Sequence, residues 1–73
     1  MKAKLKRRIV RKAQGDYFCR KCKEPAVWNV RFDYHWGTNQ SHFWCTWCLP
    51  FKYSKAALTV LEMKKPLIED FAA

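Results

Sequence analysis

Two cysteine pairs constrain the fold of this chain more than any other feature. All four cysteines of the 73 residues fall in two C-x-x-C motifs, Cys19-Arg20-Lys21-Cys22 and Cys45-Thr46-Trp47-Cys48, with residues 23–44 between them. Two residues between thiols let the backbone turn so that both sulfurs reach one ion, and two such turns complete a tetrahedron. The spacing therefore predicts one structural Zn²⁺ held by Cys19, Cys22, Cys45 and Cys48.

The other uses of paired cysteines fit less well. Two disulfides require a secreted chain, and the charged N-terminus lacks the apolar segment of a signal peptide. A thioredoxin-like redox pair accounts for only one of the two motifs. Rubredoxin-type iron sites are usually acidic and carry glycine after each pair, whereas Lys23 and Leu49 stand there in a basic chain. Four cysteines close the shell, so His35 and His42 are expected near the surface of a hairpin rather than as ligands.

The small size of the chain explains why a metal matters. A domain of this length buries only about 60% of its unfolded surface, and its core supplies about 3–5 kcal/mol. Structural zinc contributes roughly 10–16 kcal/mol of apparent binding free energy. A closed four-sulfur shell leaves no position for a reactive water, and no nucleophile–base pair stands out in the sequence. We therefore expect a binding protein, not an enzyme; a redox or electron-transfer protein is a further alternative.

The first twelve residues form a basic segment. They hold seven of the fifteen Lys and Arg residues and no acid, in a chain of net charge +9. Such a cluster binds nucleic acid, an acidic protein surface or an anionic membrane, or it serves solubility alone. Leu5 and Ile9 suit one face of a helical turn, while Ile9-Val10-Arg11 equally suits a short strand. We expect residues 1–15 to be a basic N-terminal arm.

The metal-binding module is expected over residues 16–66. Residues 26–34 alternate between apolar and polar side chains, which predicts a strand with one buried face. A turn at 37–39 and a second strand at 42–44 return the chain to the second cysteine pair. Residues 55–65 are rich in helix formers, with Ser54 as N-cap and Pro66 as the stop.

These elements predict a small metal-bound α+β fold. A β-hairpin with one C-terminal helix describes a zinc ribbon or a treble clef, and the gap between Cys48 and Ser54 favours the ribbon slightly. The apolar and acidic tail, residues 67–73, either docks on the core or stays loose. No apolar run approaches the roughly 18 residues that span a membrane, so we expect no membrane partner.

The aromatic residues exceed what a hairpin core needs. Trp28 and Phe32 lie on the apolar side of the predicted strand and are expected in the core. Trp36 falls in the hairpin tip, and Trp47 stands between two ligands. An exposed tryptophan either stacks on unpaired bases or anchors a protein interface, unless it folds back over the core.

The chain is short and basic, and a Lys/Arg segment precedes Cys19-x-x-Cys22 and Cys45-x-x-Cys48. In these features it resembles the small phage-encoded proteins that bind host RNA polymerase. The resemblance extends over Met1 to Cys48, although many zinc ribbons share the cysteine spacing. It implies a monomer in the host cytoplasm that docks near the RNA exit channel, inhibits initiation at host promoters and promotes antitermination. The residues it suggests for partner binding are Leu5, Lys6, Arg7, Arg8, Ile9 and Arg11. Trp36 and Trp47 are added to them because of their places in the hairpin tip and between two ligands.

A second hypothesis stays open from the residues alone. An RNA- or ribosome-binding zinc module would use the arm to neutralise phosphates, and Trp36 or Trp47 would stack on bases. Nascent RNA is a possible partner under both hypotheses.

Overall fold

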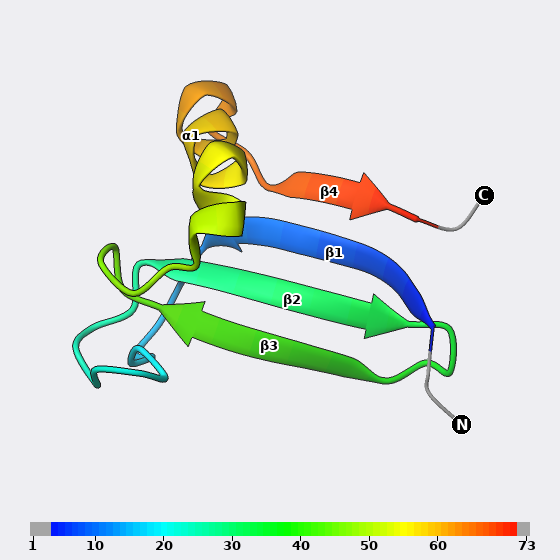
Figure 1. Cartoon of the computed structure of the whole chain (residues 1–73), viewed down its shortest axis with the longest axis horizontal. Coiled ribbons are helices and arrows are strands. Elements are labelled where there is room, and N and C mark those ends of the chain that lie inside the picture. Colours follow the sequence, from blue (N-terminus) through cyan, green and yellow to red (C-terminus); the bar gives the residue numbers. More distant parts are fainter. Residues whose placement is uncertain (1–3, 72–73) are drawn as a thin grey trace.

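A four-stranded antiparallel sheet is the frame of the molecule. The computed structural model describes residues 4–71. In chain order the elements are β1 (Leu5–Lys12), β2 (Trp28–Tyr34), β3 (Asn39–Trp44), the 3₁₀ turn η1 (Phe51–Tyr53), α1 (Ser54–Met63) and β4 (Leu67–Asp70). The strand order is β3-β2-β1-β4, and α1 lies at one end of the sheet, beside β1 and the start of β4 (Figure 1). The small α+β class expected from the sequence is confirmed, with four strands where a two-stranded hairpin was expected.

Strands β2 and β3 form the expected hairpin. Their register pairs Trp28 with Trp44 and Val30 with His42. The turn between them contains Gly37 at a φ of 81°, a backbone conformation that glycine adopts without strain. β3 begins three residues earlier than the sequence indicated, because pairing with β2 draws the polar residues 39–41 into the ladder although they carry no strand pattern of their own.

The basic segment is a strand inside the sheet and not a separate arm. β1 pairs with β2 on one side and with β4 on the other. Val10 is fully buried, so the segment contributes to the core while its charged neighbours lie on the two faces. The expected boundary at residue 15 therefore does not separate two units, because β1 belongs to the same sheet as the hairpin. Residues 1–3 of the expected arm lie outside the described residues.

The described part of the C-terminal tail docks on β1 as strand β4, and residues 72–73 of the expected tail lie outside the described residues. The register runs from Arg7 opposite Asp70 to Val10 opposite Leu67. An ion pair joins the Arg8 guanidinium to the Glu69 carboxylate at 2.7 Å. The Arg8 guanidinium also lies 5.2 Å from the ring centre of Tyr53. The hydrogen bond to Glu69 is the main reason that the pKa of Arg8 is raised. The ion pair between Arg8 and Glu69 links β1 to β4, two strands from opposite ends of the chain.

The core lies between one face of the sheet and the helix. It consists of six buried residues, Val10, Trp28, Val30, Tyr53, Ala57 and Val60, with Phe32 among the half-buried residues packed against them. The expectation that Trp28 and Phe32 belong to the core agrees with this packing. A core this small leaves much of the aromatic content at the surface, including Trp36 and Trp47.

The helix follows its sequence signals with small shifts at both ends. Ser54 is the first helical residue, because the preceding 3₁₀ turn places Tyr53 at the N-cap. Lys64 ends the helix in the left-handed conformation, with φ 56°, and donates its N–H to the Val60 carbonyl at 2.8 Å. Pro66 prevents continuation. Within residues 4–71, no helix has the length and apolar character to cross a membrane.

Replacing Val10 by alanine tests whether the basic segment belongs to the core. Loss of two buried methyl groups is expected to lower the free energy of unfolding by about 2 kcal/mol, measured by urea denaturation of the metal-loaded protein. Val27→Ala is the matched control, because Val27 keeps 39% of its surface exposed. Equal stability of the two variants would indicate that Val10 lies in an unpacked arm.

Candidate metal centre

Both cysteine pairs lie at the same end of the sheet. The first pair occupies the connection between β1 and β2, and the second follows β3 directly. β2 starts where β3 ends, so the hairpin returns the chain to its own beginning. The Arg20 N–H donates to the Phe43 carbonyl at 2.9 Å, and the Val27 N–H donates to the Trp44 carbonyl at the same distance. These hydrogen bonds fix the first cysteine loop against the end of β3.

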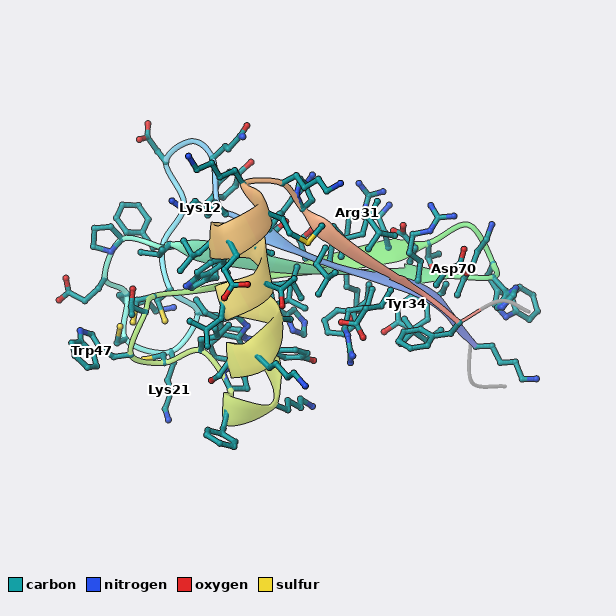
Figure 2. All side chains as sticks on the ribbon, turned by 90° about the horizontal axis from the view of Figure 1, so that it is seen from above. Lys12, Lys21, Arg31, Tyr34, Trp47 and Asp70 are labelled. Atoms are coloured by element: carbon teal, nitrogen blue, oxygen red, sulfur yellow. The ribbon has the colours of Figure 1, made fainter. Side chains whose placement is uncertain are left out.

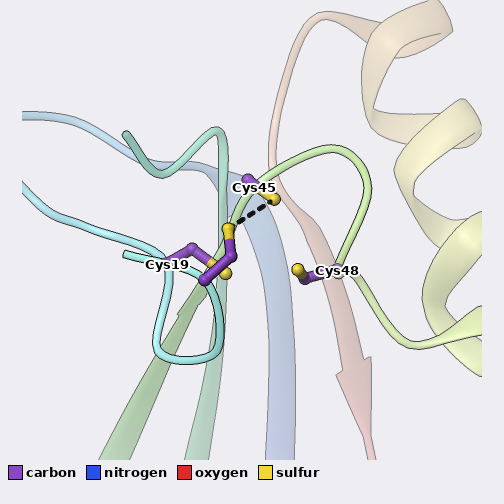
Figure 3. Close-up of side chains that lie close together, drawn as sticks. Cys19, Cys45 and Cys48 are labelled. Carbon is purple, nitrogen blue, oxygen red and sulfur yellow. Dashed lines mark hydrogen bonds between the residues drawn. The ribbon is translucent and has the colours of Figure 1, made fainter. Parts of the chain in front are cut away.

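The four sulfur atoms form one cluster. All four Sγ atoms lie within 4.8 Å of one another, and those of Cys22 and Cys45 are 3.4 Å apart (Figure 3). Four thiolates about 2.3 Å from one ion would be separated by about 3.8 Å, so the cluster fits a tetrahedral site. All four cysteines are free, which differs from the two-disulfide alternative. Among residues 4–71 the cluster contains no histidine. The cluster is therefore suited to a metal such as zinc.

Backbone turns aim the sulfurs of both pairs. In the first turn the Lys21 N–H donates to the Cys19 sulfur at 3.4 Å, and the Lys23 N–H donates to the Cys19 carbonyl at 3.0 Å. Lys23 has a φ of 67°, in the left-handed region that glycine adopts without strain and other residues rarely adopt. In the second turn the Leu49 N–H donates to the Cys45 carbonyl at 3.2 Å. Sequence reasoning missed the role of Lys23 because a lysine gives no signal for a left-handed turn.

The protonation of the cluster also suits a cation. Burial alone would raise the pKa of the Cys19 thiol, but backbone hydrogen bonds around Cys22, Cys45 and Lys21 outweigh it and lower the pKa to about 6. The pKa of Cys48 is raised to about 12, chiefly by its hydrogen bond with Cys45 and secondarily by burial. Four neighbouring sulfurs cannot all ionise against their mutual repulsion, whereas a divalent ion stabilises the fully ionised set.

The structure divides the residues expected to bind a partner into separate groups. Strand alternation places Arg7, Ile9 and Arg11 on the sheet face opposite Val10 and Val30, called here the open face. Arg8 lies on the helix side, in its ion pair with Glu69. Leu5 and Lys6 lie at the start of β1, where Leu5 is opposite Tyr34.

The two exposed tryptophans are far apart. Trp36 lies in the β2–β3 turn, two residues after Tyr34. Trp47 lies between two cysteines at the other end of the sheet from Tyr34 (Figure 2). The strands between them have about six or seven residues, so the sheet separates the two side chains by roughly 20 Å. The predicted residues therefore do not form one continuous surface.

A basic hollow of about 630 Å³ lies beside the open face and was missed by sequence reasoning. Its cations are Arg11, Lys12, Lys64 and Lys65. Tyr17 and Phe43 border it as stacked rings, with centres 4.1 Å apart and planes 5° from parallel. These residues come from four separate stretches of the chain, which strand pairing and the path of α1 bring together, so no local pattern reveals their proximity.

No family model, curated protein or solved structure matches the chain.

Replacing one ligand tests the metal centre. Cys19→Ser is expected to reduce the bound metal from one ion per chain to a small fraction and to remove the near-ultraviolet circular dichroism of the tryptophans, because metal binding and folding are coupled in small domains. Metal is measured by elemental analysis after dialysis. The control is Thr46→Ser, an exposed position between two ligands. Full metal content in the Cys19→Ser protein would contradict the site.

The pH dependence of metal affinity provides a second test. Cys48, with a pKa of about 12, keeps its proton at pH 7–9 until an ion displaces it. A backbone hydrogen bond at Glu24 would lower the pKa of Cys22, but burial and its hydrogen bonds with Cys45 and Cys19 outweigh it, so this pKa is also raised. Binding therefore releases two protons at pH 7–8, and affinity should rise about a hundredfold per pH unit there. Below pH 6 the slope should steepen, because Cys19, with a pKa of about 6, also becomes protonated. Competition with a chromophoric chelator measures this, and an affinity independent of pH would contradict it.

Proposed function

We propose that the protein is a non-catalytic, zinc-stabilised regulator of transcription that binds a bacterial RNA polymerase. One structural Zn²⁺ would be held by the four cysteines in a ribbon-like arrangement, with two cysteine turns at one end of a sheet. Four sulfurs complete tetrahedral coordination and leave no position for a reactive water. The ion would act by holding the turns in place, so that the residues around them form a rigid surface.

The observation that carries this proposal is the exposure of Trp47. Its side chain is 93% exposed, although it stands between Cys45 and Cys48, whose positions the metal would fix. Phe51, in the turn that leads to α1, is 92% exposed. Large aromatic side chains held in solvent by a rigid backbone favour a protein interface, because they bury much area with little loss of conformational freedom. Trp47 is therefore the expected centre of the contact.

The choice of polymerase as the partner rests on the resemblance to small phage-encoded regulators. Lys6 and Arg7 of β1, which do not line the basic hollow, support electrostatic attraction to an acidic protein surface. Bound beside the RNA exit channel, the module would block promoter-specific initiation and hinder the growth of a terminator hairpin by its bulk and charge. In this mechanism no covalent bond forms or breaks.

Trp47→Ala tests the interface. Loss of a central tryptophan should weaken binding to purified polymerase by roughly 30-fold, the effect of a hot-spot residue worth about 2 kcal/mol. The same variant should lose read-through of an intrinsic terminator in a purified transcription assay. Retention of one metal ion per chain shows that the variant is folded.

Trp36→Ala is the matched control, because Trp36 is also exposed but lies at the opposite end of the sheet. It should bind polymerase as the parent does. If the parent protein bound no polymerase, or if Trp36→Ala caused the larger loss, this assignment of the interface would be wrong.

A further inference from the structure

The basic hollow is a shaped site built from several elements. Asn29 and Ser41 of β2 and β3 line it, and Tyr17 of the β1–β2 connection lies beside them. The C-terminal end of α1 contributes another wall, with Lys64 and Lys65. In Figure 2, α1 passes the edge of the sheet, and its C-terminal end lies on the same side of the sheet as Arg31. The lysines that follow α1 therefore reach the hollow beside the open face. The volume of about 630 Å³ is in the range of sites that hold a nucleotide-sized ligand.

The charge of the hollow has one sign. Arg11, Lys12, Lys64 and Lys65 line it, and within residues 4–71 its lining includes no aspartate or glutamate. Arg11 is held in position, because its Nε donates to the Asn29 Oδ1 at 2.9 Å. Asn29 is 2% exposed, and its Nδ2 donates to the His42 carbonyl at 3.4 Å. Four cations that converge on a concave surface create a field that attracts an anion with several charges.

An aromatic pair stands beside these cations. The Tyr17 and Phe43 rings are stacked, and Tyr17 is still 49% exposed. A flat, partly exposed ring next to cations is the arrangement with which proteins bind unpaired bases, since the ring stacks on the base and the cations contact the phosphates.

We propose that this hollow binds single-stranded nucleic acid. Phosphates contact Arg11, Lys12 and the two lysines that follow α1, and an unpaired base stacks on the Tyr17–Phe43 pair. A duplex offers phosphates but keeps its bases stacked inside, so it leaves the aromatic pair without a partner. An acidic peptide likewise satisfies the cations only. The site does not include Trp47, so it stands or fails independently of polymerase binding.

Fluorescence anisotropy with the zinc-loaded full chain and a labelled ten-nucleotide RNA tests the proposal. If four phosphates are neutralised, log K should fall with log salt with a slope of roughly −2.8, since each phosphate contact on a single strand contributes about −0.7. The double variant Lys12→Gln, Lys65→Gln should reduce that slope to roughly −1.4. A single-stranded DNA of the same length should bind in the same way, because the proposed contacts use phosphate and base rather than the 2′-hydroxyl.

The matched control is Lys52→Gln, Lys55→Gln, which changes net charge equally at two exposed lysines outside the hollow. It should leave the slope unchanged. Equal loss of slope in the two double variants would overturn the proposal, because attraction by net charge alone would then explain binding. Failure of the parent protein to bind the RNA would overturn it as well.

Tyr17→Leu tests the stacking contact. It should weaken RNA binding about tenfold, consistent with the value of one base–aromatic contact. Binding to poly-glutamate should not change, and one metal ion per chain should be retained. Tighter binding of a duplex of equal length, or of poly-glutamate, than of the single strand would show that the hollow recognises charge without bases and would overturn the proposal. Capture of polymerase by the same variants reports separately on the Trp47 interface.

Discussion

The convergence of four sulfur atoms at one end of the sheet is the constraint on which the rest of the structure depends. They converge only because β2 begins where β3 ends, so the hairpin and the metal centre require each other. The buried core has six residues, which is small for a stable domain. A metal bound at the open end of the hairpin would fix the loops that this core does not cover. Trp47, two residues after Cys45, would be held in solvent by the same restraint.

The sequence alone predicted those elements whose signals lie within a few neighbouring residues. Cysteine spacing identifies the ligands, alternation identifies β2, and helix formers before Pro66 identify α1 to within two residues. β1 was harder to predict, because its helix-facing side does not show a run of apolar residues. Val10 lies there between the charged residues Arg8 and Lys12. Arg8 is compatible with that side only because Glu69 accepts its hydrogen bond from a strand 61 residues away. A contact of that separation leaves no local pattern.

Some functional residues could likewise be predicted from local sequence signals, and others could not. The four cysteines could be named from spacing, since the chemistry of a thiolate site restricts both residue type and distance along the chain. The basic hollow could not, because Tyr17, Phe43 and Lys64 come together through strand pairing and through the path of α1. The basic N-terminal segment suggested one surface, but strand alternation sends Arg7 and Arg11 to one face and Arg8 to the other. Charge counted along a sequence therefore overstates the charge available to a single partner.

Order in β1 changes what its cations contribute to binding. In a loose arm, each arginine would lose rotamer and backbone freedom when it met a partner, which lowers affinity. In the sheet, backbone pairing on both sides has already fixed the strand, and Asn29 already orients Arg11. Figure 2 shows Trp47 and Lys12 on opposite sides of the metal end of the sheet. A protein surface at Trp47 and a nucleic-acid strand in the hollow would not compete for the same side chains, so one small module has room for both at once.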